Sequence, residues 1–257
     1  PKPHLLTWEG MERTIRLLVS MGVDKVRLTG GEPFVRRGIM EFLEEISQIQ
    51  ELRQINITTN GVLTAPLVPE FKRLGIKSVN LSLDSLDRQR FFEITRRDEF
   101  QKVWQTFEAL QEYQIPTKLN SVVMSGKNTD DIIPMAELTR EHNVSVRFIE
   151  EMPFNGDGAH EYQEFWNYRR ILEELKKQYP GIYKLPDPPA STSYNYQIPN
   201  HKGTIGIIAA FSRTFCGTCN RIRLTPQGQF KTCLYDEGVF NIKDVLRQGL
   251  NDEAVKQ

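Results

Sequence analysis

The sequence predicts an α/β fold in which strands and helices alternate along the first 152 residues. Apolar positions three or four residues apart predict helices, and short runs that are apolar at every second position predict strands. Turns that contain glycine separate these segments. Because two parallel strands need a crossover between them, the alternation indicates βαβ units and a parallel sheet.

Five strands and the helices between them follow from this pattern. The first helix carries Trp8, Met11, Ile15 and Leu18 at helical spacing, and Gly22 ends it. Strands are expected at residues 25–29, 54–58, 78–83, 117–124 and 145–150. The intervening helices are expected near residues 39–46, 67–74, 101–113 and 131–142.

The pattern changes after residue 153. We expect a loop, a helix, a Pro-rich connector, a strand and a closing helix, at residues 155–158, 162–178, 186–189, 203–211 and 242–248. We therefore divide the chain into a first part, residues 1–153, and a second part, residues 154–257, that packs on the first.

Composition excludes several classes of protein. Lys+Arg and Asp+Glu both number 33 among 257 residues, and this balance gives no sign of a nucleic-acid or membrane partner. The longest apolar run, Ile205 to Phe211, is far shorter than the ~20 residues of a spanning helix. The 3 cysteines all lie within residues 216–233. An odd, clustered set favours a metal site in a reducing compartment, so we expect a cytoplasmic protein.

One face of each expected strand is polar. An ordinary parallel sheet is apolar on both faces, and burying several cations without anions is very costly. A water-accessible lumen that holds an anionic ligand, such as a nucleoside triphosphate, explains the pattern. An antiparallel sheet with one solvated face is the alternative. The polar face comprises Lys25, Arg27, Thr29, Asn56, Thr58, Asn60, Asn80, Ser82, Asp84, Lys118, Asn120 and Arg147.

The tetrad Gly30-Gly31-Glu32-Pro33 ends the first expected strand. Ligands bind at this end of the strands in barrels and open α/β sheets. Glycines let the backbone approach a ligand closely, and the Glu32 carboxylate could accept hydrogen bonds from a ligand ammonium group. A plain turn from strand to helix would use the same residues.

The cysteines follow the spacing Cys-x2-Cys-x13-Cys at Cys216, Cys219 and Cys233. A turn at residues 226–228 would fold the third thiolate back beside the first two. A structural zinc needs a fourth ligand, which could be His201, although that residue is expected in a surface loop. A 4Fe–4S cluster would keep one iron open to an outside ligand. The spacing alone does not decide between the two metals.

Two arginines follow the second cysteine at strand spacing. Arg221 and Arg223 therefore share a face. Positive charges beside an open iron fit the binding of an anionic substrate better than they fit a structural zinc site. Solvated arginines of a hairpin would carry no such function.

Taken together, these segments resemble the MoaA family, the GTP 3′,8-cyclases of molybdenum cofactor biosynthesis. The run from Phe215 to Thr225, continued by Cys233-Leu234, is highly specific to that family. The similar stretches cover nearly the whole chain in family order. They are residues 24–33, 58–61, 80–84, 118–123, 146–150 with Met152-Pro153, and 215–234.

The resemblance implies an incomplete TIM-type (β/α) barrel, the radical SAM fold, with a C-terminal α+β part that closes the barrel mouth. It implies a lyase that uses S-adenosylmethionine and two 4Fe–4S clusters. The reaction would convert GTP to (8S)-3′,8-cyclo-7,8-dihydroguanosine 5′-triphosphate, the first step of molybdenum cofactor biosynthesis. An electron donor and the downstream cyclic pyranopterin monophosphate synthase are implied partners, and a homodimer is compatible with the resemblance.

The resemblance also assigns site residues by position. S-adenosylmethionine would contact Gly30, Gly31, Glu32, Ser82 and Met152. Cys216, Cys219 and Cys233 would hold the second cluster, whose open iron would bind the guanine. GTP would also contact Lys25, Arg27, Thr58, Lys118, Arg147, Arg221 and Arg223.

The sequence departs from the family at both ends. The family holds its first cluster with Cys-x3-Cys-x2-Cys, and this sequence has no such motif. In the family the motif would fall upstream of Pro1, and a Gly-Gly tail would follow Gln257. We expect truncation rather than a degenerate homologue, so the chain as written should bind GTP without making a radical. The alternatives are another radical SAM enzyme with an auxiliary cluster, such as a peptide-modifying one, and a non-catalytic scaffold that binds zinc or a nucleotide.

Overall fold

The computed structural model describes residues 5–152, 165–188, 191–212, 219–233, 236–248 and 251–256. Five strands run parallel in chain order, which confirms the α/β class and the parallel sheet. They are β1 (Lys25–Leu28), β2 (Gln54–Thr59), β3 (Ser78–Ser82), β4 (Thr117–Val123) and β5 (Val144–Glu150).

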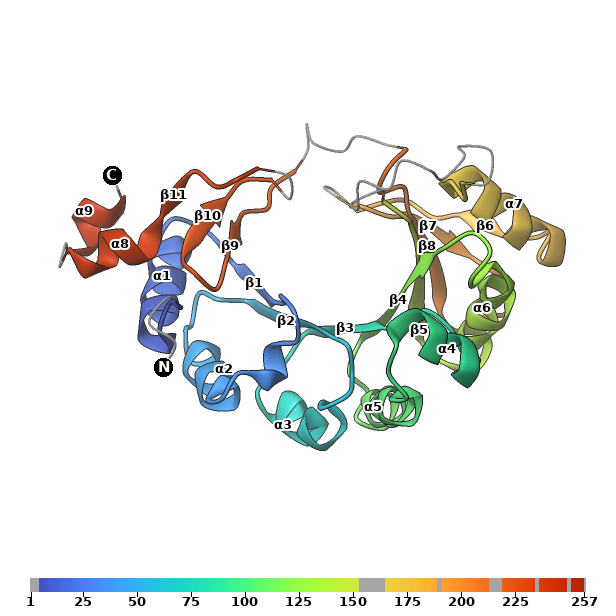
Figure 1. Cartoon of the computed structure of the whole chain (residues 1–257), viewed down its shortest axis with the longest axis horizontal. Coiled ribbons are helices and arrows are strands. Elements are labelled where there is room, and N and C mark those ends of the chain that lie inside the picture. Colours follow the sequence, from blue (N-terminus) through green and yellow to red (C-terminus); the bar gives the residue numbers. More distant parts are fainter. Residues whose placement is uncertain are drawn as a thin grey trace.

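Helices connect these strands along one face of the sheet. Figure 1 shows the strands on a curve with α2, α3, α5 and α6 on its outer side. The helices are α1 (Trp8–Ser20), α2 (Ile39–Ser47), α3 (Val68–Arg73), α5 (Phe100–Glu112) and α6 (Ile132–Glu141). One-turn 3₁₀ helices add η1 (Pro33–Val35), η2 (Ala65–Leu67) and η3 (Thr129–Asp131).

The sequence pattern did not predict helix α4 (Arg88–Thr95). This helix buries a single side chain, Phe91, so its apolar periodicity is weak. Its first turn is held by the Asp87 carboxylate, which accepts a hydrogen bond from the Arg90 amide at 2.7 Å.

The sheet continues beyond residue 153. β8 (Thr204–Ile208) pairs with β5 in parallel, and β7 (Tyr194–Gln197) and β6 (Tyr183–Lys184) follow antiparallel. α7 (Tyr168–Gln178) covers this end of the sheet. Strands of both expected parts therefore share one sheet, and the division at residue 153 stays a prediction.

The last described elements form a small second sheet. β10 (Gln229–Lys231) pairs with both β9 (Arg223–Leu224) and β11 (Phe240–Asn241), and α8 (Ile242–Arg247) and α9 (Asp252–Lys256) follow. This sheet lies beside α1 in Figure 1, and the Leu6 amide donates to the Pro226 carbonyl at 2.7 Å.

The hydrophobic core lies between the main sheet and the helices. Side chains of the strands, such as Val79, Leu81 and Leu119, are fully buried against the helix residues Phe71 and Phe107. The opposite face of the strands, which we call the lumen face, carries the polar residues. Burial alternates residue by residue along β4 and β5, as expected for strands with two different faces. Within the parts of the chain that the structure describes, each helix is too short or too polar to span a lipid bilayer.

Candidate functional site

Four cations lie along the lumen face. Lys25 and Arg27 come from β1, Lys118 from β4 and Arg147 from β5. Burial, with the positive charges of Arg147, Arg27 and Lys25, lowers the pKa of Lys118 to about 8. Burial, with the charge of Arg27, lowers the pKa of Arg147 to about 10. The four cations are thus close enough to repel one another, although they come from strands far apart in the sequence.

The strand register explains how these side chains meet. Asn80 lies opposite Lys118, and Arg147 lies between Asn120 and Gly206. A Cβ at Gly206 would come within 3.1 Å of the Arg147 Cγ, so the glycine leaves the room that the arginine side chain occupies.

Polar atoms without partners gather on the same strands. Among the described residues, five buried side-chain atoms have no hydrogen-bond partner, and four of them lie on β2 to β5. Buried polar groups are normally partnered, so the lumen face offers donors and acceptors that a bound molecule could satisfy. The four atoms are Asn56 Nδ2, Asn80 Oδ1, Asn120 Oδ1 and Arg147 Nε.

Another predicted contact residue joins this group. The Arg27 Nη1 donates to the Thr58 Oγ1 at 3.3 Å, which connects β1 with β2 on the lumen face. Thr58 lies opposite Asn80 in the register. The structure therefore brings together Lys25, Arg27, Thr58, Lys118 and Arg147, while their role toward a ligand stays a prediction.

In the glycine-rich turn after β1, groups of the protein itself bind the Glu32 side chain. The Glu32 carboxylate accepts hydrogen bonds from the Phe34 amide at 3.2 Å, the Thr59 hydroxyl at 2.9 Å and the Asn60 amide at 2.7 Å. These donors fill most of its acceptor capacity. Gly30 has a positive φ of 132°, and a Cβ there would meet no atom within 4 Å. The backbone of the turn, more than the Glu32 side chain, is thus open to a ligand.

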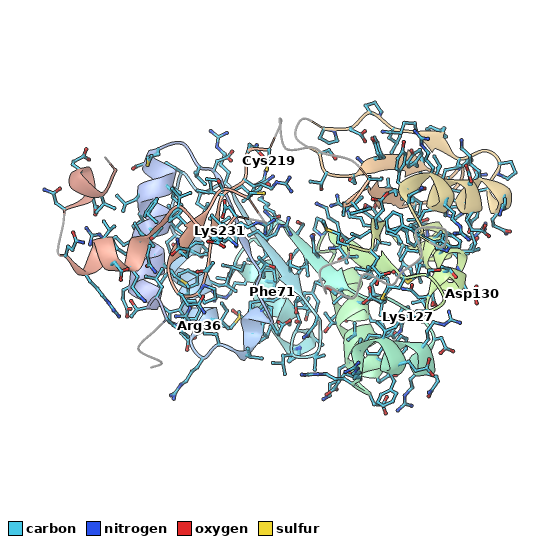
Figure 2. The ribbon with its side chains drawn as sticks, turned by 45° about the horizontal axis from the view of Figure 1, so that its top comes forward. Arg36, Phe71, Lys127, Asp130, Cys219 and Lys231 are labelled. Carbon is cyan, nitrogen blue, oxygen red and sulfur yellow. The ribbon has the colours of Figure 1, made fainter. Side chains whose placement is uncertain are left out.

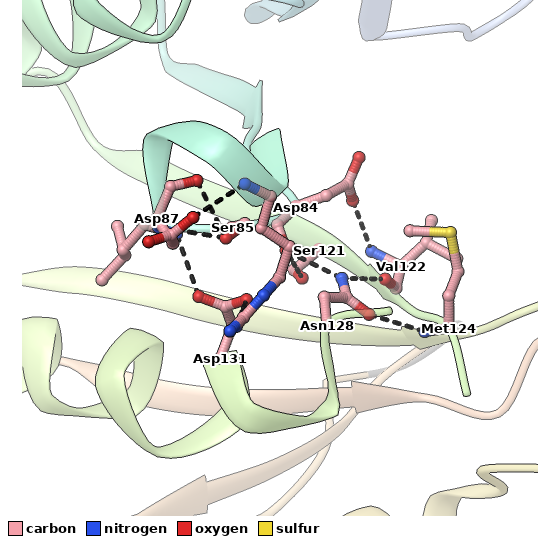
Figure 3. Close-up of polar contacts among 10 residues, drawn as sticks. Asp84, Ser85, Asp87, Ser121, Val122, Met124, Asn128 and Asp131 are labelled. Atoms are coloured by element: carbon pink, nitrogen blue, oxygen red, sulfur yellow. Dashed lines mark hydrogen bonds and ion pairs between the residues drawn. The ribbon is translucent and has the colours of Figure 1, made fainter. Parts of the chain in front are cut away.

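A network of hydrogen bonds fixes the chain where β3 and β4 end (Figure 3). The Asn128 amide group donates to the carbonyls of Asp84 and Val122 at 2.7 and 2.8 Å, and its oxygen accepts from the Met124 amide at 2.8 Å. The Asp84 carboxylate accepts from the Val122 amide at 2.8 Å, and burial raises the pKa of Asp84. The exposed Ser82, two residues before Asp84, lies opposite Asn120.

The cysteine segment is described in part. Cys216 lies outside the described residues, whereas Cys219 is exposed and Cys233 half-buried. The Arg221 backbone amide lowers the pKa of Cys219, and the positive charges of Arg221 and Arg223 lower it further. The thiolate is the form that binds metals, so this environment fits a metal-ligating cysteine.

A hydrogen bond within the turn after β10 fixes the backbone of Cys233. The Cys233 amide donates to the Asp236 carboxylate at 2.7 Å. Lys231 lies opposite Arg223 in the β9–β10 pair, on the strand that leads to Cys233. Figure 2 shows Cys219 at the upper rim of the molecule, well away from the core residue Phe71.

His201 is not where the sequence suggested. Its side chain is buried, with 8% exposed, and its Nδ1 lies 2.8 Å from the Thr139 hydroxyl on α6. The ring also contacts Tyr179 edge-on at 5.5 Å. His201 precedes β8, whereas the cysteines follow it. The surface-loop interpretation was wrong, and the contacts to α6 and Tyr179 give no support to a role as fourth zinc ligand.

Two polar residues of the site were missed in the sequence. Asn128 is 2% exposed and Glu150 only 1% exposed, and each satisfies several backbone groups at the carboxyl ends of the strands. The available signal for Glu150 was its position, because alternation along the strand predicts an apolar side chain there. Met152, expected to line the cofactor, is half-buried two residues after Glu150.

Comparison with known proteins agrees with this arrangement. The family model "Radical SAM superfamily" matches residues 1–139, and "Molybdenum Cofactor Synthesis C" matches residues 144–257. The crystal structure of Streptococcus suis SuiB bound to S-adenosylmethionine has a similar fold, with a TM-score of 0.66 at 16% identity over 93% of this chain and 57% of that one.

Relatives of similar sequence have related names. Molybdenum cofactor biosynthesis protein moc-5 of Caenorhabditis elegans is 38% identical over all of this chain, which spans 43% of that protein. Molybdenum cofactor biosynthesis protein 1 of Bos taurus is 39% identical, and the chain spans 40% of its length. The chain thus spans less than half of these animal relatives.

A bacterial relative is matched over most of its length. GTP 3′,8-cyclase of Syntrophomonas wolfei is 40% identical over 98% of this chain and 78% of that protein. The parallel sheet, the glycine-rich turn after β1 and the cysteine segment all lie within this match. On these grounds the chain belongs to the radical SAM superfamily and, within it, to the GTP 3′,8-cyclase family.

Proposed function

We propose that this chain binds GTP and S-adenosylmethionine and serves the radical cyclisation of GTP to (8S)-3′,8-cyclo-7,8-dihydroguanosine 5′-triphosphate, the first step of molybdenum cofactor biosynthesis. The observation that carries the proposal is the set of cations on the lumen face. Within the described residues, no carboxylate forms an ion pair with Lys25, Arg27, Lys118 or Arg147. A triphosphate would supply the missing negative charge.

Different residues would contact different parts of GTP. Lys118 and Arg147, the more buried cations, would hold the triphosphate, with Arg27 and Thr58 beside them. Arg221 and Arg223 would contact the same nucleotide from the side of Cys219. Contacts at two places would fix the orientation of the ribose.

The cofactors would occupy two further places. The open backbone of Gly30 and Gly31, together with Glu32, Ser82 and Met152, would receive S-adenosylmethionine. The hydrogen bonds of Glu32 to Thr59 and Asn60 would hold the turn in shape. When bound with a reduced 4Fe–4S cluster, S-adenosylmethionine supplies the radical that starts the reaction.

Cys216, Cys219 and Cys233 would hold the second 4Fe–4S cluster, which leaves one iron for the guanine. The lowering of the pKa of Cys219 by Arg221 and Arg223 supports this assignment, because thiolates are the ligands of such clusters. The sequence contains 3 cysteines, so the first cluster requires cysteines that this sequence does not supply. We further propose a cytoplasmic location, an external electron donor and transfer of the product to cyclic pyranopterin monophosphate synthase; a homodimer is compatible with these roles.

Anaerobic reconstitution with iron and sulfide tests the proposal. We expect about four irons per chain at the three cysteines, no stoichiometric zinc, and GTP binding measured by calorimetry. The double variant Arg221→Ala with Arg223→Ala should weaken GTP binding roughly tenfold or more while iron content stays the same. Arg53→Ala with Arg97→Ala, which removes two exposed arginines elsewhere, is the matched control.

Two outcomes would count against the proposal. Stoichiometric zinc bound in place of iron would favour a structural scaffold. Unchanged GTP affinity in the Arg221/Arg223 double variant would contradict the role given to these arginines.

A further inference from the structure

The segment before α1 is fixed by a side chain that follows the glycine-rich turn. Arg36 ends η1, and its Nη2 donates to the Leu6 carbonyl at 2.6 Å. The guanidinium also lies over the Trp8 ring, 3.7 Å from the ring centroid, and the Trp8 indole nitrogen donates to the Arg37 carbonyl at 3.0 Å. Trp8 stacks in turn on the buried Phe42 at 4.6 Å. A guanidinium can stack through its face while its edge donates, so Arg36 holds the ring and the carbonyl together.

The turn that carries Arg36 is bonded to the main sheet. The Glu32 carboxylate accepts from the hydroxyl of Thr59, the last residue of β2, at 2.9 Å. Two residues later, the Phe34 ring stacks on the buried Phe71 of α3 at 5.4 Å. Arg36 therefore extends from a backbone whose place relative to the lumen strands is fixed.

The other side of Leu6 is bonded to the second sheet. The Leu6 amide donates to the Pro226 carbonyl at 2.7 Å, and Pro226 lies in the turn between β9 and β10. This β9–β10 hairpin, residues 219–233, is described throughout, and its first strand begins at Arg223. A continuous series of hydrogen bonds thus runs from the Arg36 side chain through the Leu6 backbone to the hairpin.

Apolar packing between the second sheet and α1 is incomplete. The two lie side by side (Figure 1), but a cavity of about 290 Å³ separates part of their surfaces. Protein interiors are normally close-packed, so a gap of this size weakens the apolar contact. We therefore expect the place of the hairpin to depend on the hydrogen bonds of Leu6. The cavity is lined by Leu17, Leu18 and Met21 of α1 and by Phe230, Phe240 and Ile242 on the other side.

We propose that Arg36 is a positioning residue that, through Leu6, holds the β9–β10 hairpin in place relative to the lumen cations. The inference rests on the proposed function, in which GTP contacts the lumen cations and also Arg221 and Arg223 of the hairpin. Both groups of cations must then keep a fixed separation. A misplacement of about 1 Å between groups that act together can remove much of their joint benefit.

A double-mutant cycle tests this coupling by calorimetry on the reconstituted protein. We expect Arg36→Met to lower the affinity for GTP roughly fivefold. In a protein that already carries Arg221→Ala and Arg223→Ala, the same change should alter the affinity by less than about twofold, because the arginines through which Arg36 acts are absent. Arg37→Met is the matched control, since it removes the neighbouring exposed arginine and should have less than about a twofold effect in both backgrounds.

Hydrogen exchange gives a second measurement that does not depend on GTP. The Leu6 amide belongs to a buried residue and donates to Pro226, so it should exchange slowly in the wild type. Arg36→Met should speed this exchange roughly tenfold by loosening the segment before α1. Arg37→Met should leave the exchange rate unchanged.

The outcomes keep the inference separate from the proposed function. A wild-type protein that does not bind GTP, or that binds it equally well without Arg221 and Arg223, would contradict the proposed function and, with it, the inference. If GTP binds as proposed, an effect of Arg36→Met that is absent, or equal in both backgrounds, would overturn the inference alone. An unchanged exchange rate at Leu6 would do the same.

A milder variant covers the case in which Arg36→Met does not fold. Arg36→Lys keeps the charge and a donor for the Leu6 carbonyl but loses the flat group that stacks on Trp8. We expect it to lower GTP affinity about threefold, and only in the background that retains Arg221 and Arg223. Equal affinities of Arg36→Lys and wild type for GTP, or equal losses in the two backgrounds, would overturn the inference.

Discussion

Replacing Lys118 by Met should stabilise the ligand-free protein. Lys118 is a half-buried cation that faces three others, and its pKa is lowered from 10.5 to about 8. That lowering corresponds to roughly 3 kcal/mol of free energy spent on keeping the side chain charged in the fold at pH 7. Met has similar length and no charge. Since water entering the lumen screens part of the effect, we expect the free energy of unfolding to rise by about 2 kcal/mol.

The pH dependence of this gain follows from the same shift. Between pH 8 and pH 10.5 the unfolded wild-type chain binds more protons at Lys118 than the folded chain. Wild-type stability therefore rises with pH across this window through this group, and the variant lacks that rise. The advantage of Lys118→Met should be complete below pH 8 and shrink as the pH approaches 10.5.

Urea unfolding at pH 7 and pH 9.5 measures both quantities. Lys77→Met, which removes an exposed lysine before β3, is the control and should change the free energy of unfolding by less than about 0.5 kcal/mol. A Lys118→Met variant that is no more stable than wild type at pH 7, or whose advantage does not shrink at pH 9.5, would refute the claim that burial and the neighbouring cations make the charge of Lys118 costly in the fold.

Two further predictions concern the same sheet. Wild-type affinity for tripolyphosphate, measured by calorimetry, should fall severalfold between pH 7 and pH 9 as Lys118 loses its proton near pH 8, because the neutral amine attracts the anion less; a flat profile would count against Lys118 as a contact. Gly203→Ala should cost more than about 3 kcal/mol in chemical unfolding, since the new Cβ would lie 2.2 Å from the Val144 carbonyl oxygen. The control Gly75→Ala has open space around it and only a strained φ of 69°, so it should cost about 1 kcal/mol, and equal losses in both variants would disprove the steric argument.

Much of the fold could be predicted because the strands are strongly patterned. Alternation along β4 predicted Lys118 and Asn120 on one face and Leu119 on the other, and burial agrees with this. The register could not be predicted, since it depends on how helices of different length pack on the sheet. The neighbours of each lumen cation therefore became known only from the structure. Arg147, for example, lies between Asn120 and Gly206.

The unpredicted parts share a physical cause. Glu150 and Asn128 satisfy backbone groups that are distant in the sequence, such as the amides of Phe211 and Ser212. No local pattern records such partners. His201 was misplaced for the same reason, because its burial depends on Thr139 and Tyr179 from other elements.

The pairing of β4, β5 and β8 also decides how this chain can be cut. The first family match ends at residue 139 and the second begins at residue 144, a natural boundary for cloning two fragments. A cut there would expose the seven-residue edge of β4 in one fragment and an edge of β5 in the other. Bare edges invite aggregation. The fragments are expected to become soluble only when they are produced together, because the two regions matched by the family models should behave as halves of one folding unit.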